Sequence, residues 1–148
     1  MSTIFDNGVR ESLLQRIAKL NKSCEAEWGK MTVDQMILHC LLWDEMAQLQ
    51  RKYTQTFIGR IFGKLVLKSF LKEGELLKRN VESFPEIIVS ERGDTENDKL
   101  KWQDSINKYS NLPDKHEFIH PFFGKVNREQ TGRLAFKHTD HHLRQFGL

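Results

Sequence analysis

Apolar residues along this chain recur mainly at spacings of three and four, which is the period of one face of an α-helix. Val9, Leu13, Ile17 and Leu20 form the first such stripe. Thr32-Val-Asp-Gln35 has the form of a capping box, which marks the start of a helix. The pattern predicts five helices, at about residues 8–21, 32–52, 57–73 and 95–109, and from 127 through the C-terminal histidines.

Two stretches interrupt the helical pattern, at residues 74–94 and 110–126, and both contain proline and glycine. Within the first of them, residues 86–89 are the candidate for a short extended segment. Sustained alternation of period two is almost absent, so we predict an all-α fold of the helical-bundle class. The connection from 53 to 94 is too long for a tight turn. It predicts a crossover, so the two helices that it joins need not be antiparallel neighbours.

Length and composition fit one soluble domain spanning residues 1–148, with 39% hydrophobic and 29% charged residues. The net charge of +3 is too small to indicate nucleic-acid binding. Cys24 and Cys40 form neither a CxxC motif nor a secreted disulfide framework. No secretory signal and no membrane span is recognisable. We therefore expect a cytoplasmic protein without a nucleic-acid partner, and a homodimer stays open.

Three histidines lie close together in the C-terminal segment KHTDHHLRQFGL, residues 137–148. In a helix that turns about 100° per residue, His138 and His142 fall at about 40° and 80° from Leu134, on the inward side. His141 falls beside the charged residues instead. His138 and His142 are therefore predicted to form a pair one turn apart on the same face.

A fourth histidine, His39, lies in the middle of the apolar face of the second predicted helix. The polar arc opposite includes Asp44. An HxxxH pair offers two metal ligands from one rigid element, and an imidazole from a facing helix would complete a three-histidine site. Three alternatives stay open: a chance HxxxH pair, a core histidine bonded to backbone or carboxylate, and histidines that satisfy one another without a metal ion.

Two longer segments resemble a known family. WGKMTVDQMILHC, residues 28–40, resembles the entry to the second helix of DinB-like metal-binding proteins. HPFFGKVNREQTGRLAFKHTDHHLRQFG, residues 120–147, is similar to the C-terminal signature of an uncharacterised branch of that superfamily. The two segments cover about a quarter of the chain. The resemblance implies a four-helix bundle whose long crossover here contains an extra amphipathic helix.

The resemblance also implies a ligand set and a range of chemistry. One divalent metal ion would be held by His39, His138 and His142, while His141 departs from this set. Zinc or nickel is the expected ion, with iron or manganese as alternatives. Superfamily members include S-transferases and an isomerase that use low-molecular-weight thiols. For this chain the resemblance therefore implies a small-molecule substrate or thiol.

Three further residues carry side chains that could contribute to the site. His120, before Pro121, is a weak candidate for a catalytic acid, base or donor to a metal ligand, and local hydrogen bonding is the favoured alternative. Cys40 lies about 100° from His39 on the helix, so we expect a small buried apolar residue rather than a ligand. His116 lies in a polar loop and has no indicated function.

A basic, apolar-rich stretch runs from residue 51 to residue 72, with six lysines or arginines and no acidic residue. A helix of this composition can lie on an anionic membrane surface or bind an acidic partner. The favoured interpretation is a helix that covers the core and turns its lysines to solvent.

The sequence thus predicts a divalent-metal protein, and two function classes remain. One is a metal-dependent thiol S-transferase or hydrolase, in which the ion activates a thiol or water. The other is a non-catalytic metal-containing binding module, whose basic amphipathic helix engages a partner or a membrane surface. No general base or nucleophile can be named.

Overall fold

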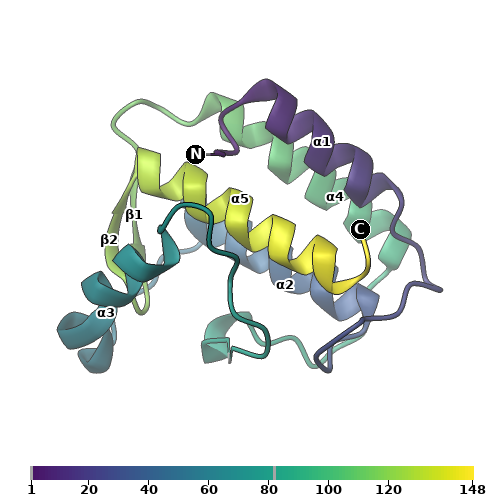
Figure 1. The fold of residues 1–148 in the computed structure, drawn as a ribbon, viewed down its shortest axis with the longest axis horizontal. Helices are drawn as coiled ribbons and strands as arrows, with labels where there is room; N and C mark the ends of the chain where they lie inside the picture. The colour runs from purple at the N-terminus through teal and green to yellow at the C-terminus, as the bar shows by residue number, and fades with distance from the viewer. Residues whose placement is uncertain (1, 82) are drawn as a thin grey trace.

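The fold is mainly helical, with five α-helices and one short hairpin in the described part of the chain (Figure 1). The computed structural model describes residues 2–81 and 83–148. The helices are α1 (Asn7–Ala18), α2 (Val33–Ala47), α3 (Phe57–Phe70), α4 (Thr95–Lys108) and α5 (Arg128–Gln145). All five predicted helices are present. α2 is shorter than predicted, ending at Ala47 instead of near residue 52, and Leu49 just beyond it has a positive φ of 62°.

The starts of α2 and α5 follow from their capping residues. The side-chain oxygen of Gln35 accepts a hydrogen bond from the Thr32 backbone N–H at 3.1 Å. At α5, Asn127 accepts from the Gln130 backbone N–H at 3.0 Å, and Gln130 accepts in return from the Asn127 N–H at 3.1 Å. These bonds satisfy amides that have no partner within the helix, so the helices begin where the sequence predicts.

The expectation of an all-α fold was wrong for residues 117–127. Strands β1 (Glu117–His120) and β2 (Gly124–Asn127) pair antiparallel, with Phe118 opposite Val126. Both side chains are buried. Each strand contributes only four residues of alternation, which is too short a signal to separate from a loop. The extended segment proposed at residues 86–89 is wrong in its first part, because Pro85–Ile87 forms a 3-10 turn, whereas Ile88 has extended backbone dihedral angles.

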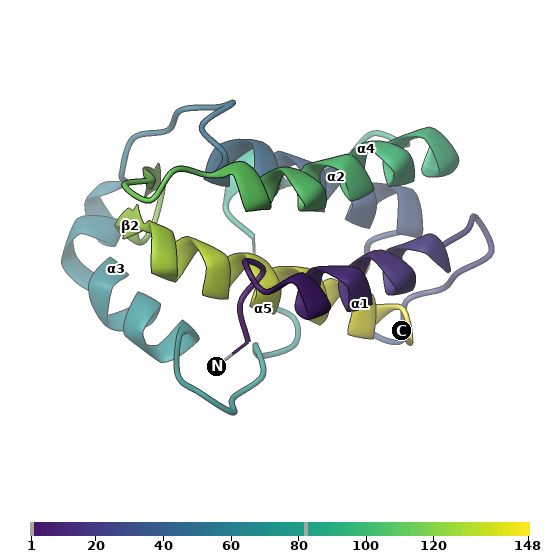
Figure 2. The ribbon, with the colours of Figure 1, turned by 90° about the horizontal axis from the view of Figure 1, so that it is seen from above.

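The four helices other than α3 pack side by side (Figures 1 and 2). α2 contacts α4 and α5, and α1 contacts the same two helices. α2 and α4 run in one direction, and α1 and α5 run in the other. The crossover predicted between α2 and α4 therefore joins two parallel neighbours. It contains α3, which lies to one side against β2.

One hydrophobic cluster fills the space between the packed helices, with Ile17, Met36, Trp102 and Leu143 among its buried members. Asp44 also lies inside, with 1% of its surface exposed, so its predicted place on the polar face was wrong. The Tyr109 hydroxyl donates to Asp44 Oδ1 at 2.7 Å. Burial raises the pKa of this carboxyl to about 7, although the Tyr109 hydrogen bond opposes the shift.

Helix α3 corrects the favoured interpretation of the basic stretch. It turns lysines to solvent, as expected, but most of its large apolar side chains are exposed as well. Leu67 is an exception, because its side chain is buried. Gly59 and Gly63 form most of the rest of the inner face. A helix that covers the core would bury an apolar stripe.

No helix in the described residues combines the length and hydropathy needed to cross a membrane.

Candidate metal centre

Three histidines from two helices meet between α2 and α5. His39 comes from α2, and His138 and His142 come from successive turns of α5. One ring nitrogen from each can be chosen so that all three lie within 4.8 Å of one another. The ring centroids are 4.6 to 5.1 Å apart. In the described residues this is the group of histidine, cysteine or acidic side chains whose geometry could hold a metal ion.

The local structure explains why these rings converge. The i, i+4 spacing stacks His138 and His142 on one face of α5. That face packs against α2, whose apolar face carries His39. Trp43, one turn further along α2, stacks on the His138 ring with a centroid distance of 5.0 Å and an angle of 20°. The pair and the single histidine therefore meet as the helical periodicity predicts.

The hydrogen-bond partner of His39 determines which of its nitrogens can bind a metal. Its Nδ1 lies 2.8 Å from the carbonyl oxygen of Ile87, which can only accept, so Nδ1 carries the proton. Nε2 of the neutral ring then presents a lone pair. Nε2 of His138 lies 3.0 Å away. At this distance His138 can donate a hydrogen bond to His39, so the two rings can satisfy each other without an ion. Two nitrogens bound to one tetrahedral zinc ion lie about 3.3 Å apart, so a small separation of the rings would also allow shared coordination.

His142 is oriented in the same way by a side chain. Its Nδ1 lies 2.9 Å from Gln145 Oε1. The Gln145 amide nitrogen donates to the Trp28 carbonyl at 2.8 Å, which fixes the amide oxygen as the atom that faces His142. Nδ1 of His142 is therefore the donor, and Nε2 is available as a ligand atom. Such partners fix ring orientation in metal sites.

Burial keeps all three rings neutral at neutral pH. Desolvation is the largest cause of a lowered pKa in each case, and it takes His142 to about 3. For His138, the electrostatic interaction with His142 and His39 lowers the pKa further. A metal ion binds the neutral form of imidazole. The site therefore holds three nitrogen donors in the protonation state that coordination needs.

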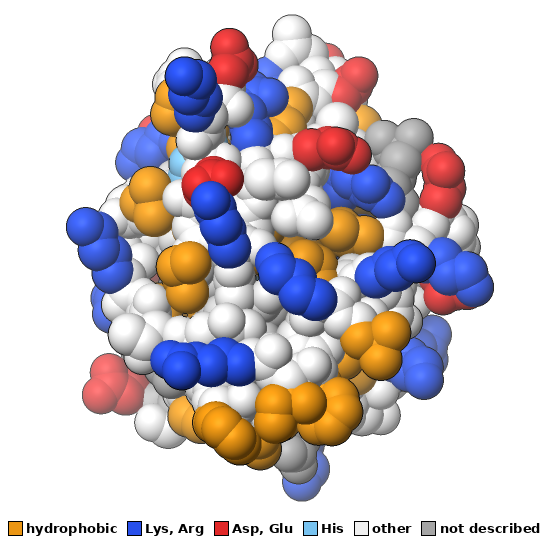
Figure 3. Space-filling view, turned by 90° about the vertical axis from the view of Figure 1, so that its left-hand side faces the viewer, with side chains coloured by type: hydrophobic (Ala, Val, Ile, Leu, Met, Phe, Trp, Pro, Cys, Tyr) orange, Lys and Arg blue, Asp and Glu red, His pale blue; other side chains and the backbone are white. Residues whose placement is uncertain are grey.

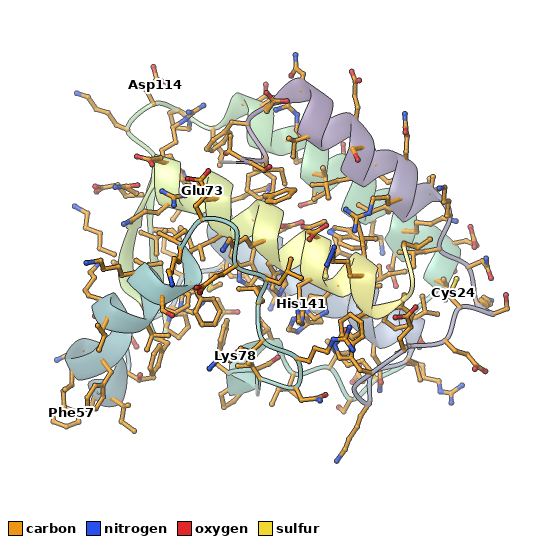
Figure 4. All side chains as sticks on the ribbon, in the orientation of Figure 1. Cys24, Phe57, Glu73, Lys78, Asp114 and His141 are labelled. Atoms are coloured by element: carbon orange, nitrogen blue, oxygen red, sulfur yellow. The ribbon has the colours of Figure 1, made fainter. Side chains whose placement is uncertain are left out.

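His141 lies outside the ligand group, as predicted. Its ring is edge-on to His142 at 5.2 Å and to Trp28 at 5.9 Å. It faces the loop that carries Lys78 (Figure 4). Together with Trp28, Arg79 and Arg144 it lines a surface pocket of about 480 Å³. Arg79 packs over the Trp28 ring at 3.9 Å. The pocket itself was not predicted from the sequence.

His120 lies in β1 and is not a member of the ligand group. Its Nδ1 accepts hydrogen bonds from the backbone N–H groups of Phe122 and Phe123 at 3.1 and 3.2 Å. The ring stacks on Phe123 at 4.2 Å, and burial lowers its pKa to about 3. His120 is still near enough to His138 for its charge to lower the pKa of that ring. These contacts support the structural interpretation of His120 over the catalytic one.

The other two candidates have structural contacts. Cys40 is buried, as predicted, and burial raises the pKa of its thiol well above the ordinary value. His116 lies in the loop before β1, as predicted, but its side chain is buried. Its Nε2 lies 2.7 Å from the carbonyl oxygen of Ala47 at the end of α2. His116 therefore satisfies a helix-end carbonyl.

Sequence reasoning missed the partners that orient the rings. Gln145 stands three residues after His142, a spacing at which helix side chains meet, so this signal was available. Ile87 acts through its backbone carbonyl, which leaves no mark in the sequence. Comparisons of the chain with protein-family models, curated proteins and solved structures found no match. The geometry of the three histidines is therefore the basis for any functional assignment.

Proposed function

We propose that this chain is a DinB-like protein of the four-helix-bundle type that holds one divalent metal ion through His39, His138 and His142. The observation that carries the proposal is the convergence of the three ring nitrogens within 4.8 Å. The order of the ligands also supports it, with one imidazole on an early helix and an HxxxH pair on the last one. This is the arrangement implied by the resemblance to DinB-like proteins.

The orientation of the rings and the kind of side chains present support the proposal of a metal ion. Two of the rings donate Nδ1–H to oxygen acceptors and so direct Nε2 inward. Three imidazoles without a carboxylate or thiolate suit zinc or nickel, with iron or manganese as weaker alternatives. Three protein ligands also leave coordination positions for water or a thiol, as catalytic sites require.

The activity that we propose is metal-dependent transfer to a low-molecular-weight thiol, or hydrolysis. A bound divalent ion would supply Lewis acidity, which lowers the pKa of a thiol or water at the open position. The chain would bind the small-molecule substrate in the pocket beside His141, whose lining combines basic side chains such as Arg79 with acidic ones such as Asp140. Trp43 and the other apolar neighbours would limit access of bulk water.

Metal content tests the site directly. Protein purified without a polyhistidine tag is analysed for zinc, nickel, iron and manganese, alongside His39→Ala/His138→Ala and the control His141→Asn. We expect about one ion per chain in the wild type and control, and loss of the ion in the double variant. Equal metal content in the wild type and the double variant would contradict the site.

The competing function is a non-catalytic binding module, and the exposed apolar face of α3 favours it. A screen of several low-molecular-weight thiols with electrophilic and hydrolysable substrates separates the two. Turnover that disappears in His39→Ala/His138→Ala and persists in Leu100→Ser, a change at an exposed leucine on α4, supports the enzyme. Turnover that is absent throughout, or that is independent of metal, favours the binding module.

A further inference from the structure

The inner face of α3 packs so closely on the hairpin that the position of the helix is fixed. A Cβ atom added at Gly59 would lie 2.4 Å from the carbonyl oxygen of Phe122, and one at Gly63 would lie 2.1 Å from it. Such backbone approach requires residues without a side chain. Just before the helix, the Thr56 N–H donates to the Pro121 carbonyl at 2.8 Å. These contacts hold the inner face of α3 against the hairpin. The outer face is therefore left exposed.

The outer face presents five large apolar side chains. Phe57 is 76% exposed, Leu65 71%, Ile58 62%, Ile61 59% and Phe62 52%. With Phe57 set at zero, they span an arc from about 0° to 140° around the helix. Hydrophobic side chains gather along the lower edge of this side of the molecule in Figure 3, and Phe57 points away from the body in Figure 4. A contiguous exposed face of this kind indicates an interaction surface.

Basic side chains border the apolar arc. On the same wheel, Arg60, Lys64 and Lys68 fall at about 300°, 340° and 20°. The segment from 51 to 72 contains six basic residues and no acidic one. Within the part of the chain that the structure describes, these three side chains form no ion pair. The surface thus combines a large apolar face with positive charge: Arg60 and Lys64 lie along one flank and Lys68 lies within the arc near the same edge. The Lys64 ammonium also donates to the Lys125 carbonyl.

A second copy of the chain is a poor occupant for this face. In an antiparallel two-fold pair of α3 helices, the two basic flanks would lie on the same side of the interface. Residues 51–72 offer no carboxylate to neutralise them, so the like charges would repel. The occupant should instead offer an apolar layer and negative charge together.

An anionic lipid bilayer has both properties. We infer that α3 docks this protein on anionic membrane surfaces, with Phe57, Ile61 and Leu65 at the acyl boundary. Arg60 and Lys68 then lie at the level of the lipid phosphates. Interfacial helices have this division into an apolar face and a basic face. The inference does not depend on the metal centre, because none of these residues belongs to it.

The physical basis of the contact predicts a reversible association. Apolar burial and attraction to anionic headgroups each give weak binding alone, and together they hold a peripheral protein. Each basic residue near an anionic surface contributes about a fivefold factor in affinity, which is screened by salt. Binding should therefore weaken as ionic strength rises, and it should require anionic lipid.

Vesicle flotation tests the inference with the full chain. Vesicles of phosphatidylcholine are compared with vesicles that contain phosphatidylcholine and phosphatidylserine in equal amounts. The test variants are Phe57→Ser/Leu65→Ser and Arg60→Glu/Lys68→Glu. Matched controls are Leu100→Ser, an exposed leucine on α4, and Lys22→Glu/Lys30→Glu, two exposed lysines outside α3. Circular dichroism and urea unfolding verify that each variant is folded.

We expect the wild type and both controls to float with the phosphatidylserine vesicles and not with phosphatidylcholine alone. Arg60→Glu/Lys68→Glu should bind the anionic vesicles at least about 25-fold more weakly. Phe57→Ser/Leu65→Ser keeps the charge but loses apolar burial, and it should bind at least about 10-fold more weakly. Wild-type protein that fails to bind, or α3 variants that bind as well as wild type, would overturn the inference. Tighter binding to polyglutamate than to vesicles would assign the face to an acidic protein. A dimer that Phe57→Ser/Leu65→Ser converts to monomer would assign it to a second copy.

Discussion

The Nδ1 atom of His142 lies 2.9 Å from the side-chain oxygen of Gln145, one turn further along α5. The amide of Gln145 cannot turn around without losing its bond to the Trp28 carbonyl. This connection determines which nitrogen of His142 is available as a ligand. It also links the last turn of α5 to the segment before α2.

Gln145→Met is expected to weaken metal binding without removing a ligand. Methionine fills a similar volume but accepts no comparable hydrogen bond, so the His142 ring loses its orientation. Loss of such a partner costs about 10- to 100-fold in metal affinity. Zinc titration of the metal-free protein measures the change, with Gln103→Met on α4 as the control. Equal affinity for zinc in wild type and Gln145→Met would contradict this role.

Asp44 is expected to make stability fall as pH rises through the weakly acidic range. Its pKa is about 7 in the folded protein, against an ordinary value of 3.8. Between these values the folded state keeps a proton that the unfolded state has released. Raising the pH therefore favours unfolding in this window. The pKa shift from 3.8 to about 7 corresponds to a loss of roughly 4 kcal/mol at most in the free energy of unfolding.

Asp44→Asn isolates this contribution, because asparagine keeps an oxygen acceptor for Tyr109 and does not titrate. Urea unfolding at a series of pH values gives the free energy of unfolding for both proteins. The difference, wild type minus variant, should decrease as pH rises from about 4 to about 7 and then level off. A difference that does not change with pH would contradict a protonated Asp44 in the folded state.

Gly63→Ala is expected to destabilise the attachment of α3. Alanine normally favours a helix over glycine by about 1 kcal/mol. Here the added Cβ would meet the Phe122 carbonyl oxygen at 2.1 Å, so α3 or the hairpin must shift. We expect a net loss of about 1–3 kcal/mol in the free energy of unfolding. Amide hydrogen exchange in α3 should also become faster, whereas the exposed control Ser69→Ala should leave it unchanged.

His120→Phe is expected to lower stability while leaving metal content intact. The change leaves two backbone N–H groups without an acceptor, at a cost of about 1–3 kcal/mol. His120→Asn places an oxygen near the position of Nδ1 and should restore part of the loss. Urea unfolding and elemental analysis measure the two effects. Loss of bound metal in a folded His120→Phe protein would indicate a role in the centre instead.

The predictable part of the candidate site is the part that helical periodicity encodes. His138 and His142 are four residues apart, and His39 lies among apolar neighbours, so one face of each helix had to point inward. The starts of α2 and α5 were predictable for a similar reason, because capping residues act within three positions. Local rules of this kind need no knowledge of the rest of the fold.

The errors concern contacts between distant segments. Asp44 appeared to belong to a polar arc, because its partner Tyr109 stands 65 residues away on the far side of the crossover. For α3, the sequence shows apolar residues around most of the helix and cannot indicate which side packs. The glycines on one face decide this, since they allow backbone contact with Phe122.

The bond from His39 to Ile87 comes from the main chain, and this affects how the sequence can change over time. Another side chain of similar size at position 87 would leave the acceptor in place. Insertion or deletion of a residue between α3 and α4 would instead displace that carbonyl. The orientation of His39 therefore depends on where the backbone passes at position 87, and the kind of side chain there does not enter the bond.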